Sequence, residues 1–531
     1  MKKFTFLAII LLSAVCTFAQ AGFEWAHAMG KPFYGETNTR LTSDQNGNII
    51  MAGGFVDTAY FESQALVSNG GTDIFVANYD PTGDLQWLIS EGGPDYESVQ
   101  GIAANDQSIL MCASFYGTSE IGTETFESMG SQDIILASYD QGGNFSWAQH
   151  FGSPKTDYVN AVCSDPEGNI IFTGHYYDSI SFGDTSLYAL GGSDIFIAKY
   201  SSAGNRIWLR QASGSSSDQS HTIACDEDGN IVFSGSYFND ITIGDTTFTT
   251  QDPTGVFFAK LNSEGDLIFA VQADGNGLIA NSFALFDNSG NIFFAGNFTD
   301  QIHFGPYDFD AGAFNIDVFI SKYSSVGNLL WADHGHGLSS DQLISVSTGP
   351  LNDLYISGHY LDHITFGDLT LEYTLCCGSP EVFLVRYSED GTASWGDRIS
   401  GERALVEDIC KNASDELFVA GIFQIELTFG SIVLEANEGF MNYLSGVATA
   451  TMTSLSEEKE IHELSIYPNP AGSYIMLDAE GDYRIFDMSG RLMRSGKVHG
   501  GKVDVSSLRT GTYFIEIMDL GDTFASRFLK K

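Results

Sequence analysis

Apolar and polar positions follow one pattern that recurs along the chain, and residues 194–214, DIFIAKYSSAGNRIWLRQASG, show it most clearly. Two apolar runs are joined by a Ser-Ala-Gly-Asn turn, and the first run carries apolar side chains at both odd and even positions. Because side chains alternate between the two faces of a strand, such a run indicates a strand that is covered on both faces. The pattern predicts a β-hairpin packed between neighbouring sheets.

An aromatic residue recurs near the end of this hairpin at intervals of 62, 60, 61, 61, 62 and 64 residues. A strand resembling GNIIFTGHY (168–176) and a strand resembling DIFIAKY (194–200) each occur seven times. Self-similarity at a fixed period is the signature of a repeat architecture. We expect the aromatics to be packing residues, with a sugar-binding platform as the alternative. They are Trp25, Trp87, Trp147, Trp208, Phe269, Trp331 and Trp395.

The two ends of the repeat array are out of phase with each other. Trp25 has no DIF-type strand before it, and the last such strand, 439–444, has no aromatic strand after it. Since these two strands form a hairpin in each internal repeat, we expect the N-terminal strand to pair with 439–444. The sequence therefore predicts an all-β fold, a seven-bladed β-propeller over 22–447 closed by pairing of its N- and C-terminal strands.

Residues 1–21 have the features of a secretory signal peptide. Lys2 and Lys3 precede an apolar run, and small residues at Ala19 and Ala21 predict cleavage before Gly22. A lipoprotein signal that uses Cys16 is the alternative, which Val15 disfavours. Because no other apolar run approaches the ~20 residues needed to cross a bilayer, we expect no transmembrane segment in the mature protein.

The composition changes after the repeats. Residues 448–461 are rich in Ser, Thr and Ala and are predicted to be a linker. Residues 462–531 contain short alternating strands, which predict a small β-sandwich. This tail has nine acidic and nine basic residues, so the net charge of −44 belongs to the repeat region. Such an acidic surface excludes nucleic acid as a partner, because phosphate binding needs a basic face.

Two groups of polar residues are candidates for ligand or metal binding. The turns that begin at Asp44, Asp165, Asp226 and Asp287 share the pattern Asp-x-x-Gly-Asn, which raises the question of calcium. Calcium needs six to eight oxygens, whereas Asp-x-x-Gly is what a tight turn selects by itself, so no cofactor is expected and calcium is the minor alternative. His175 and His359 share one repeat position and are candidate ligand-facing residues, with hydrogen-bonded histidines as the alternative.

The cysteines show no metal-ligand spacing. Cys112, Cys163, Cys225 and Cys410 fall in predicted strands and are expected to be small buried hydrophobic residues. The adjacent Cys376 and Cys377 lie in a predicted loop, where a vicinal disulfide and two free thiols are both open interpretations. No nucleophile elbow, zinc-binding helix or phosphate-binding glycine loop occurs in the sequence.

The body resembles the repeat family known as SBBP seven-bladed β-propeller repeats. The resemblance is carried by DIFVANYDPTGDLQW (73–87), DIFIAKYSSAGNRIW (194–208) and DVFISKYSSVGNLLW (317–331). It implies a fold and exposure to the outside, and it implies no enzymatic reaction.

The tail resembles a type A sorting domain of the Bacteroidetes type IX secretion system. The resemblance is carried by YPNP (467–470), FDMSGRLM (486–493), VDVSSLRTGTYFIEI (503–517) and the closing FLKK. It implies recognition by the outer-membrane exporter, removal of the tail, and a secreted or surface-attached protein. The matching sorting-signal residues are Tyr467, Pro468, Asn469, Pro470, Gly490, Gly511 and Tyr513.

The leading functional hypothesis is a non-enzymatic binding or adhesion module at the cell surface, with a glycan or a surface protein as its ligand. The alternatives are a secreted polysaccharide hydrolase or lyase built on a propeller scaffold, and a structural component of the surface layer.

Overall fold

A computed structural model describes residues 23–29, 38–250, 254–275, 281–373, 379–401, 403–412, 414–429 and 432–447 of the repeat region. In the tail it describes 462–463, 466–467, 471–477, 481–486, 492–498, 501–519 and 522–531. The described residues form β-strands and no helix. Accordingly, this part of the chain has no helix that is long and apolar enough to cross a membrane.

The repeat region consists of sets of four antiparallel strands. The innermost strands are β2 (Arg40–Ser43), β8 (Tyr96–Ala104), β12 (Asp157–Ser164), β16 (Asp218–Cys225), β22 (Ser282–Phe286), β26 (Gln342–Thr348) and β32 (Leu405–Lys411). The second strands, which contain the GNI pattern, are β3 (Ile49–Phe55), β9 (Ile109–Ile121), β13 (Ile170–Ser181), β17 (Ile231–Tyr237), β23 (Ile292–Phe304), β27 (Leu354–Tyr360) and β33 (Leu417–Phe429).

The DIF pattern forms the third strands, and the repeat aromatics lie on the outer strands. The third strands are β6 (Asp73–Tyr79), β10 (Glu124–Tyr139), β14 (Ser186–Tyr200), β20 (Gly255–Leu261), β24 (Tyr307–Tyr323), β30 (Glu381–Tyr387) and β34 (Ile432–Val447). The outer strands are β7 (Leu85–Glu91), β11 (Phe145–Phe151), β15 (Arg206–Ser213), β21 (Leu267–Gly275), β25 (Leu329–His336), β31 (Ala393–Gly401) and β1 (Phe23–Met29).

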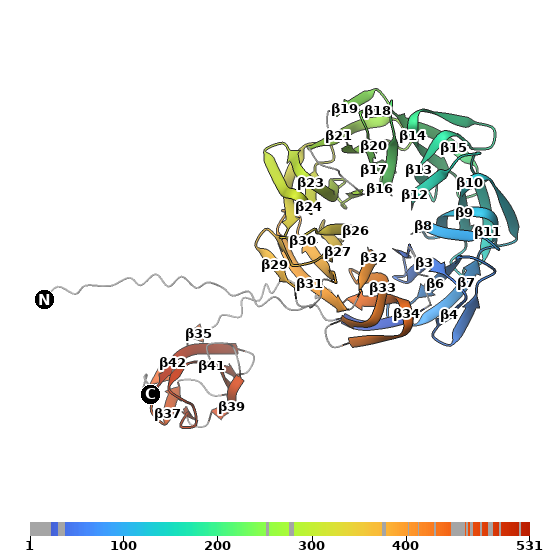
Figure 1. Cartoon of the computed structure of the whole chain (residues 1–531). Helices are drawn as coiled ribbons and strands as arrows, with labels where there is room; N and C mark the ends of the chain where they lie inside the picture. Colours follow the sequence, from blue (N-terminus) through green and yellow to red (C-terminus); the bar gives the residue numbers. More distant parts are fainter. Residues whose placement is uncertain are drawn as a thin grey trace. The chain divides into compact units, whose positions relative to one another are not determined.

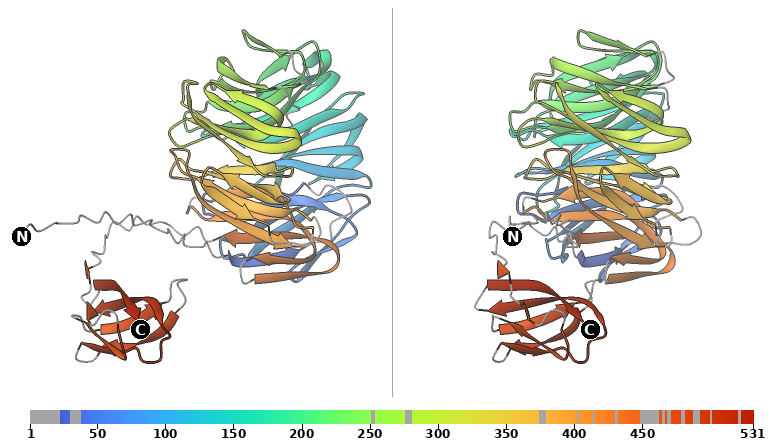
Figure 2. Two further views of the ribbon diagram at one scale, coloured as in Figure 1. Left: turned by 60° about the vertical axis from the view of Figure 1, so that its left-hand side comes forward. Right: turned by 90° about the vertical axis from the view of Figure 1, so that its left-hand side faces the viewer.

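The sets are arranged around a centre like the blades of a propeller, as Figure 1 and Figure 2 show. β1 pairs with β34 in an antiparallel ladder that runs from Phe23 opposite Val447 to Met29 opposite Asn442. The N-terminal strand thus completes a set with β32, β33 and β34. The expected partner segment, 439–444, overlaps this ladder, which extends three residues further along β34.

Hydrophobic clusters lie between adjacent sets. One cluster contains Leu110 and Leu136 from the β8–β11 set together with Phe172 and Phe196 from the β12–β15 set. The stretch 195–200 of β14 is buried at each position, as expected for a strand covered on both faces. Burial of these two-sided strands is the main hydrophobic contribution to stability.

Short side hairpins extend from some sets and contact the outer strand of the preceding set. For example, β18 adds to β15 through the pairs Ala212–Ile243 and Ser213–Thr242. Such two-residue ladders join several sets into larger continuous sheets. The separate side hairpins are β4 (Thr58–Phe61) with β5 (Gln64–Val67), β18 (Asp240–Ile243) with β19 (Thr246–Thr249), and β28 (His363–Phe366) with β29 (Leu369–Glu372).

The chain divides into two compact units, 1–450 and 451–531. In the second unit, β35 (His462–Glu463), β38 (Gly481–Phe486), β39 (Leu492–Val498), β41 (Gly511–Asp519) and β42 (Asp522–Lys530) form one sheet. A smaller sheet contains β36 (Ile466–Tyr467), β37 (Tyr474–Leu477) and β40 (Lys502–Asp504). Both sheets contribute to a single hydrophobic cluster, with Ile475 and Val503 from one and Ile485 and Ile515 from the other.

Candidate functional site in the central channel

A cavity of 780 Å³ lies among the innermost strands, and we call it the channel cavity. Residues of β2, β8, β12, β16, β22, β26 and β32 line it, and Figure 1 shows β8, β12, β16, β26 and β32 around the centre of the arrangement. Ligand sites in proteins are concave and combine apolar walls with a few convergent polar groups. The channel cavity has both features and is the candidate functional site.

β-Bulges contribute polar side chains to this cavity. The ladder of β8 with β9 skips Gln100, that of β12 with β13 skips Asn160, and that of β32 with β33 skips Glu407. A bulge leaves one residue out of the ladder and redirects its side chain. With Arg40 and His221, these residues recur at close to the repeat length. The sequence analysis missed them, although their spacing equals that of the aromatics.

Carboxylates connect the two ends of the repeat region at the cavity. Glu407 Oε2 accepts a hydrogen bond from the Thr39 main-chain N–H at 3.0 Å, and Asp408 Oδ2 accepts one from the Leu41 N–H at 2.8 Å. Asp408 Oδ1 also accepts from Ser345 Oγ at 2.6 Å. Burial raises the pKa of Asp408. These carboxylates are therefore engaged in holding β2 and β26 against β32.

His175 and His359 lie on second strands of different sets, and the structure does not bring them together. His175 is 6% exposed, and its Nδ1 lies 3.0 Å from Asn160 Oδ1. His359 Nε2 accepts a hydrogen bond from the Val406 main-chain N–H at 2.9 Å. Burial lowers the pKa of His175 to about 3 and that of His359 to about 4. Both imidazoles are neutral at pH 7, and a ligand-facing role stays a prediction.

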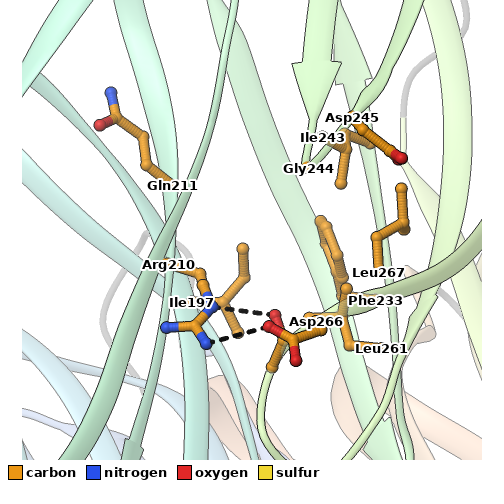
Figure 3. A pocket seen from close by; sticks show the side chains of 11 residues that line it. Ile197, Arg210, Gln211, Phe233, Ile243, Gly244, Asp245, Leu261, Asp266 and Leu267 are labelled. Atoms are coloured by element: carbon orange, nitrogen blue, oxygen red, sulfur yellow. Dashed lines mark hydrogen bonds and ion pairs between the residues drawn. The ribbon is translucent and has the colours of Figure 1, made fainter.

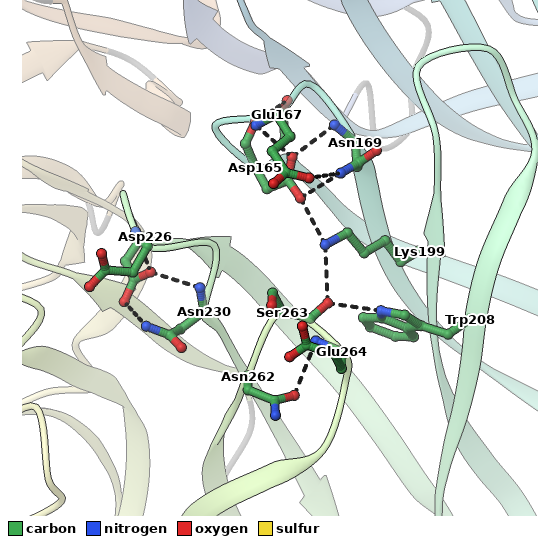
Figure 4. Close-up of polar contacts among 12 residues, drawn as sticks. Asp165, Glu167, Asn169, Lys199, Trp208, Asp226, Asn230, Asn262, Ser263 and Glu264 are labelled. Carbon is green, nitrogen blue, oxygen red and sulfur yellow. Dashed lines mark hydrogen bonds and ion pairs between the residues drawn. The ribbon is translucent and has the colours of Figure 1, made fainter.

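The repeat aromatics contact the following set of strands. Trp208 is 9% exposed, and its Nε1 donates a hydrogen bond to the Ser263 main-chain oxygen at 3.0 Å. Figure 4 shows this bond. Gly265 follows in the same turn with φ +80°, and a Cβ there would come within 3.1 Å of the indole. Equivalent bonds run from Trp25 to Pro81, Trp87 to Gln141, Trp147 to Ser202 and Trp331 to Glu389.

Trp395 differs from the other tryptophans. Its Nε1 is buried and has no hydrogen-bond partner among the described residues. In the other pairs the acceptor lies in the turn between a third strand and an outer strand. At this junction those two strands are β34 and β1, which come from opposite ends of the chain. Because β34 and β1 are not consecutive in the sequence, no turn joins them, and the turn that usually supplies the acceptor is missing at this junction.

The Asp-x-x-Gly-Asn turns are held by hydrogen bonds and ion pairs. Asp165 Oδ1 accepts the main-chain N–H groups of Glu167 and Asn169, and Asp165 Oδ2 lies 2.8 Å from Lys199 Nζ (Figure 4). Equivalent Asp–Lys distances are 3.8 Å at Asp226–Lys260 and 2.8 Å at Asp287–Lys322. In the described residues no three or more His, Cys, Asp or Glu side chains are grouped to hold a metal. Calcium at these turns stays a prediction.

Two smaller clefts lie at the junction between the β12–β15 set and the next set. One, of 360 Å³, lies beside Lys199 and Trp208. The other, of 330 Å³, is shown in Figure 3, where Arg210 reaches across to Asp266 with Nη2 and Oδ1 3.3 Å apart. Both partners of this ion pair are more than one-third exposed, so it contributes little to stability. These clefts lie at the packing interface between two neighbouring strand sets.

The described cysteines are free thiols, with Cys112 and Cys410 buried and Cys163 and Cys225 half-buried. Burial raises the pKa of Cys112 to about 12, so this thiol is protonated and unreactive at neutral pH. Cys376 and Cys377 lie outside the described residues.

The sorting-signal residues are only partly described. Tyr467 lies in β36 and is 60% exposed, and Gly511 begins β41. Tyr513 is buried, donates a hydrogen bond to the Arg509 main-chain oxygen at 3.0 Å, and stacks on Phe528. The segments 1–21 and 448–461, with Pro468, Asn469, Pro470 and Gly490, lie outside the described residues.

Comparison with known proteins identifies the tail. Residues 465–531 match the family model described as secretion system C-terminal sorting domain. A curated relative, an uncharacterized WD repeat-containing protein of Acanthamoeba polyphaga mimivirus, is 24% identical over 331 residues. The match covers 49% of this chain and 24% of that protein, so the chain spans about a quarter of the relative's length.

Two solved structures that resemble the fold have low similarity scores. Virginiamycin B lyase from Staphylococcus aureus has a TM-score of 0.38 at 9% identity, covering 79% of this chain and 99% of that one. PorZ, a surface component of the type IX secretion system of Porphyromonas gingivalis, has a TM-score of 0.21 at 12% identity, covering 95% and 100%.

The sorting domain determines where the protein acts. A secretion-system sorting domain at 465–531 directs the attached chain through the type IX machinery. The acidic, propeller-like repeat region is therefore carried to the cell surface or beyond it. Residues 465–531 thus form a domain that matches the secretion system C-terminal sorting domain.

Proposed function

We propose that the strand sets are the blades of a seven-bladed propeller closed by β1 and β34, and that a small β-sandwich sorting domain follows it in the sequence. We propose further that this propeller is a non-enzymatic binding module that takes a glycan or a surface protein at the channel cavity. The β1–β34 ladder supports closure. The tail sequence supports action outside the cell.

The observation that carries the binding proposal is that hydrogen bonds hold the polar side chains that line the channel cavity in place. Asn160 Oδ1 accepts from Ser220 Oγ at 3.1 Å, and Gln100 Nε2 donates to Ser98 Oγ at 3.2 Å. His221 Nδ1 accepts the Ser282 main-chain N–H at 3.0 Å. Side chains fixed by such bonds form a preorganised surface, which lowers the entropic cost of binding.

A glycan array probed with the chain 22–531 tests this proposal, followed by calorimetry with the best ligand. We expect the channel variant Gln100→Ala to weaken binding by about tenfold, which corresponds to ~1.4 kcal/mol. The matched control is Gln86→Ala, because Gln86 is exposed on β7 and lies outside the lining of the channel cavity.

The outcomes separate the functional classes. Binding lost in Gln100→Ala and kept in Gln86→Ala supports the channel site. Equal losses in both variants refute it. Release of soluble products from the same polysaccharides indicates a hydrolase or lyase. Ordered polymerisation with neither binding nor turnover indicates a structural component of the surface layer.

A further inference from the structure

Pairs of buried carboxylates recur where one strand set meets the next. The first residue of a DIF strand is acidic, and a second acidic residue follows 24 positions later, at the start of the next innermost strand. The exposed fractions of these side chains lie between 0 and 2%. The pairs are Asp73 with Glu97, Asp133 with Asp157, Asp194 with Asp218, and Asp317 with Asp341.

The pair Asp317–Asp341 has oxygens without donors. Both carboxylate oxygens of Asp341 and Oδ1 of Asp317 are buried and have no hydrogen-bond partner among the described residues. A buried carboxylate without a partner is costly, because the charge is removed from water and nothing replaces its hydration. Burial followed by the charge of Asp317 raises the pKa of Asp341 to about 9. The Asp341 main-chain N–H donates to the Ile316 main-chain oxygen at 2.7 Å, which places Asp341 beside the residue that precedes Asp317.

A glycine leaves room for a third oxygen beside this pair. A Cβ on Gly337 would collide with the His363 main-chain oxygen and come within 2.8 Å of Asp341 Oδ2. The same arrangement recurs two repeats earlier in the chain. A Cβ on Gly214 would collide with the Asp240 main-chain oxygen and lie 3.2 Å from Asp218 Oδ2. Because glycine has no Cβ, a main-chain oxygen can approach one carboxylate of the pair closely at both junctions.

In the second pair, Asp194 Oδ2 accepts hydrogen bonds from the Leu190 main-chain N–H at 2.9 Å and from Gln211 Nε2 at 2.8 Å. Asp194 Oδ1 and both oxygens of Asp218, in contrast, have no partner among the described residues.

Several other buried acids of the fold have partners at both carboxylate oxygens. Asp165 and Asp287 pair with lysines, as described above. Glu381, which begins β30, accepts hydrogen bonds from Tyr360 Oη at 2.7 Å and Ser400 Oγ at 3.0 Å. The residue 24 positions after Glu381 is Leu405, so this junction has one acid and two neutral donors.

One repeat lacks both acids. Gly255 begins the DIF-type strand of that repeat, and the residue 24 positions later is Ile279. At the Asp133 junction, His150 Nε2 lies 2.6 Å from Asp133 Oδ2 and supplies a compensating group. The Asp194–Asp218 and Asp317–Asp341 pairs each have three buried carboxylate oxygens without a partner and a main-chain oxygen beside the glycine, and they are therefore the strongest candidates for an added cation.

We propose that Asp317 and Asp341, with the His363 main-chain oxygen, bind a divalent cation of the calcium type, and that Asp194, Asp218 and the Asp240 main-chain oxygen bind a second one. Calcium takes six to eight oxygen ligands in flexible geometry, including carboxylates, main-chain oxygens and water. Extracellular modules bind it with dissociation constants of about 10⁻⁴ to 10⁻³ M. Because the chain is exported, both sites lie in the extracellular setting to which these dissociation constants apply.

Equilibrium dialysis of the chain 22–531 against radioactive calcium, together with thermal unfolding in calcium or EDTA, tests this proposal. We expect about two bound ions per chain, as the two proposed sites require, and a higher Tm in calcium than in EDTA. Asp341→Asn should lose one bound ion and reduce the calcium-dependent rise in Tm. Asp218→Asn should do the same at the other site, which keeps the test decisive if one variant fails to fold.

The matched control is Asp228→Asn, because Asp228 is exposed in an Asp-x-x-Gly-Asn turn. We expect it to keep both ions. Binding no ion above the buffer level overturns the proposal. The proposal is also overturned if the substitution Asp341→Asn raises the Tm by the same amount in calcium and in EDTA. In that case a proton, and not a cation, neutralises the carboxylate pair. An equal response to magnesium refutes the calcium type. None of these measurements depends on the ligand of the channel cavity.

Discussion

Two tryptophans at equivalent positions should respond differently to the same substitution. Trp208 Nε1 donates to the Ser263 main-chain oxygen at 3.0 Å, whereas Trp395 Nε1 is buried without an acceptor among the described residues. A hydrogen bond contributes about 0.5–1.5 kcal/mol, and an unpaired buried donor costs about 1–3 kcal/mol. Replacement by phenylalanine removes the bond in one case and the unpaired donor in the other. Phe269 shows that a phenyl ring is accepted at this position.

We therefore expect Trp208→Phe to lower the free energy of unfolding by about 1.5–3 kcal/mol, counting the lost bond and the smaller ring. We expect Trp395→Phe to change it by less than about 1 kcal/mol, because the lost packing and the removed donor offset each other. Denaturant unfolding with an unchanged m-value measures both. Equal losses in the two variants would show that ring packing, and not the N–H group, determines the response.

The remaining predictions concern a buried ion pair, a buried histidine and export. Lys322→Met should destabilise the protein by about 3–5 kcal/mol in denaturant unfolding, because Asp287 is left buried without its cation; a loss below about 1 kcal/mol would contradict this. His359 is neutral when folded, with a pKa of about 4 against ~6.5 when unfolded, so its contribution is lost as pH falls from 6.5 to 4. His359→Gln should remove about 3 kcal/mol of acid sensitivity, measured by unfolding across that range. Deletion of 465–531 should leave the protein inside the cell envelope on fractionation, and surface exposure of the truncated chain would be inconsistent with sorting by the tail.

The strand types and the pairing of the ends follow from the sequence because they depend on period and phase. The run at 195–200 has apolar residues on both faces, and the structure buries it on both faces. The absence of a DIF-type strand before Trp25 leaves its outer strand without a neighbour, and β34 supplies one. Local patterns decide these features, so a single chain is sufficient to predict them.

The channel lining was not predicted, since a bulge depends on the ladder in which it occurs. Gln100 and Asn160 differ in chemistry from Glu407, so residue type does not mark their shared repeat position, and the skipped ladder position shows that each lies in a bulge. The partners of buried polar groups were missed for a similar reason. Lys199 and Asp165 lie 34 positions apart, and their contact depends on how β14 packs beside the turn before β13.

The junction between the β26 set and the β32 set lacks a contact on its outer side and has hydrogen bonds on its channel side. On the outer side, Trp395 lacks the hydrogen bond that its counterparts make to the following turn. On the channel side, His359 Nε2 accepts the Val406 N–H, and Asp408 Oδ1 accepts from Ser345 Oγ. The set that contains both ends of the repeat region is thus attached to this neighbour by the channel-side contacts as well as by the ladder of β31 with β33. Because the neutral imidazole of His359 is one of the channel-side contacts, we infer that protonation of His359 weakens this junction at acid pH.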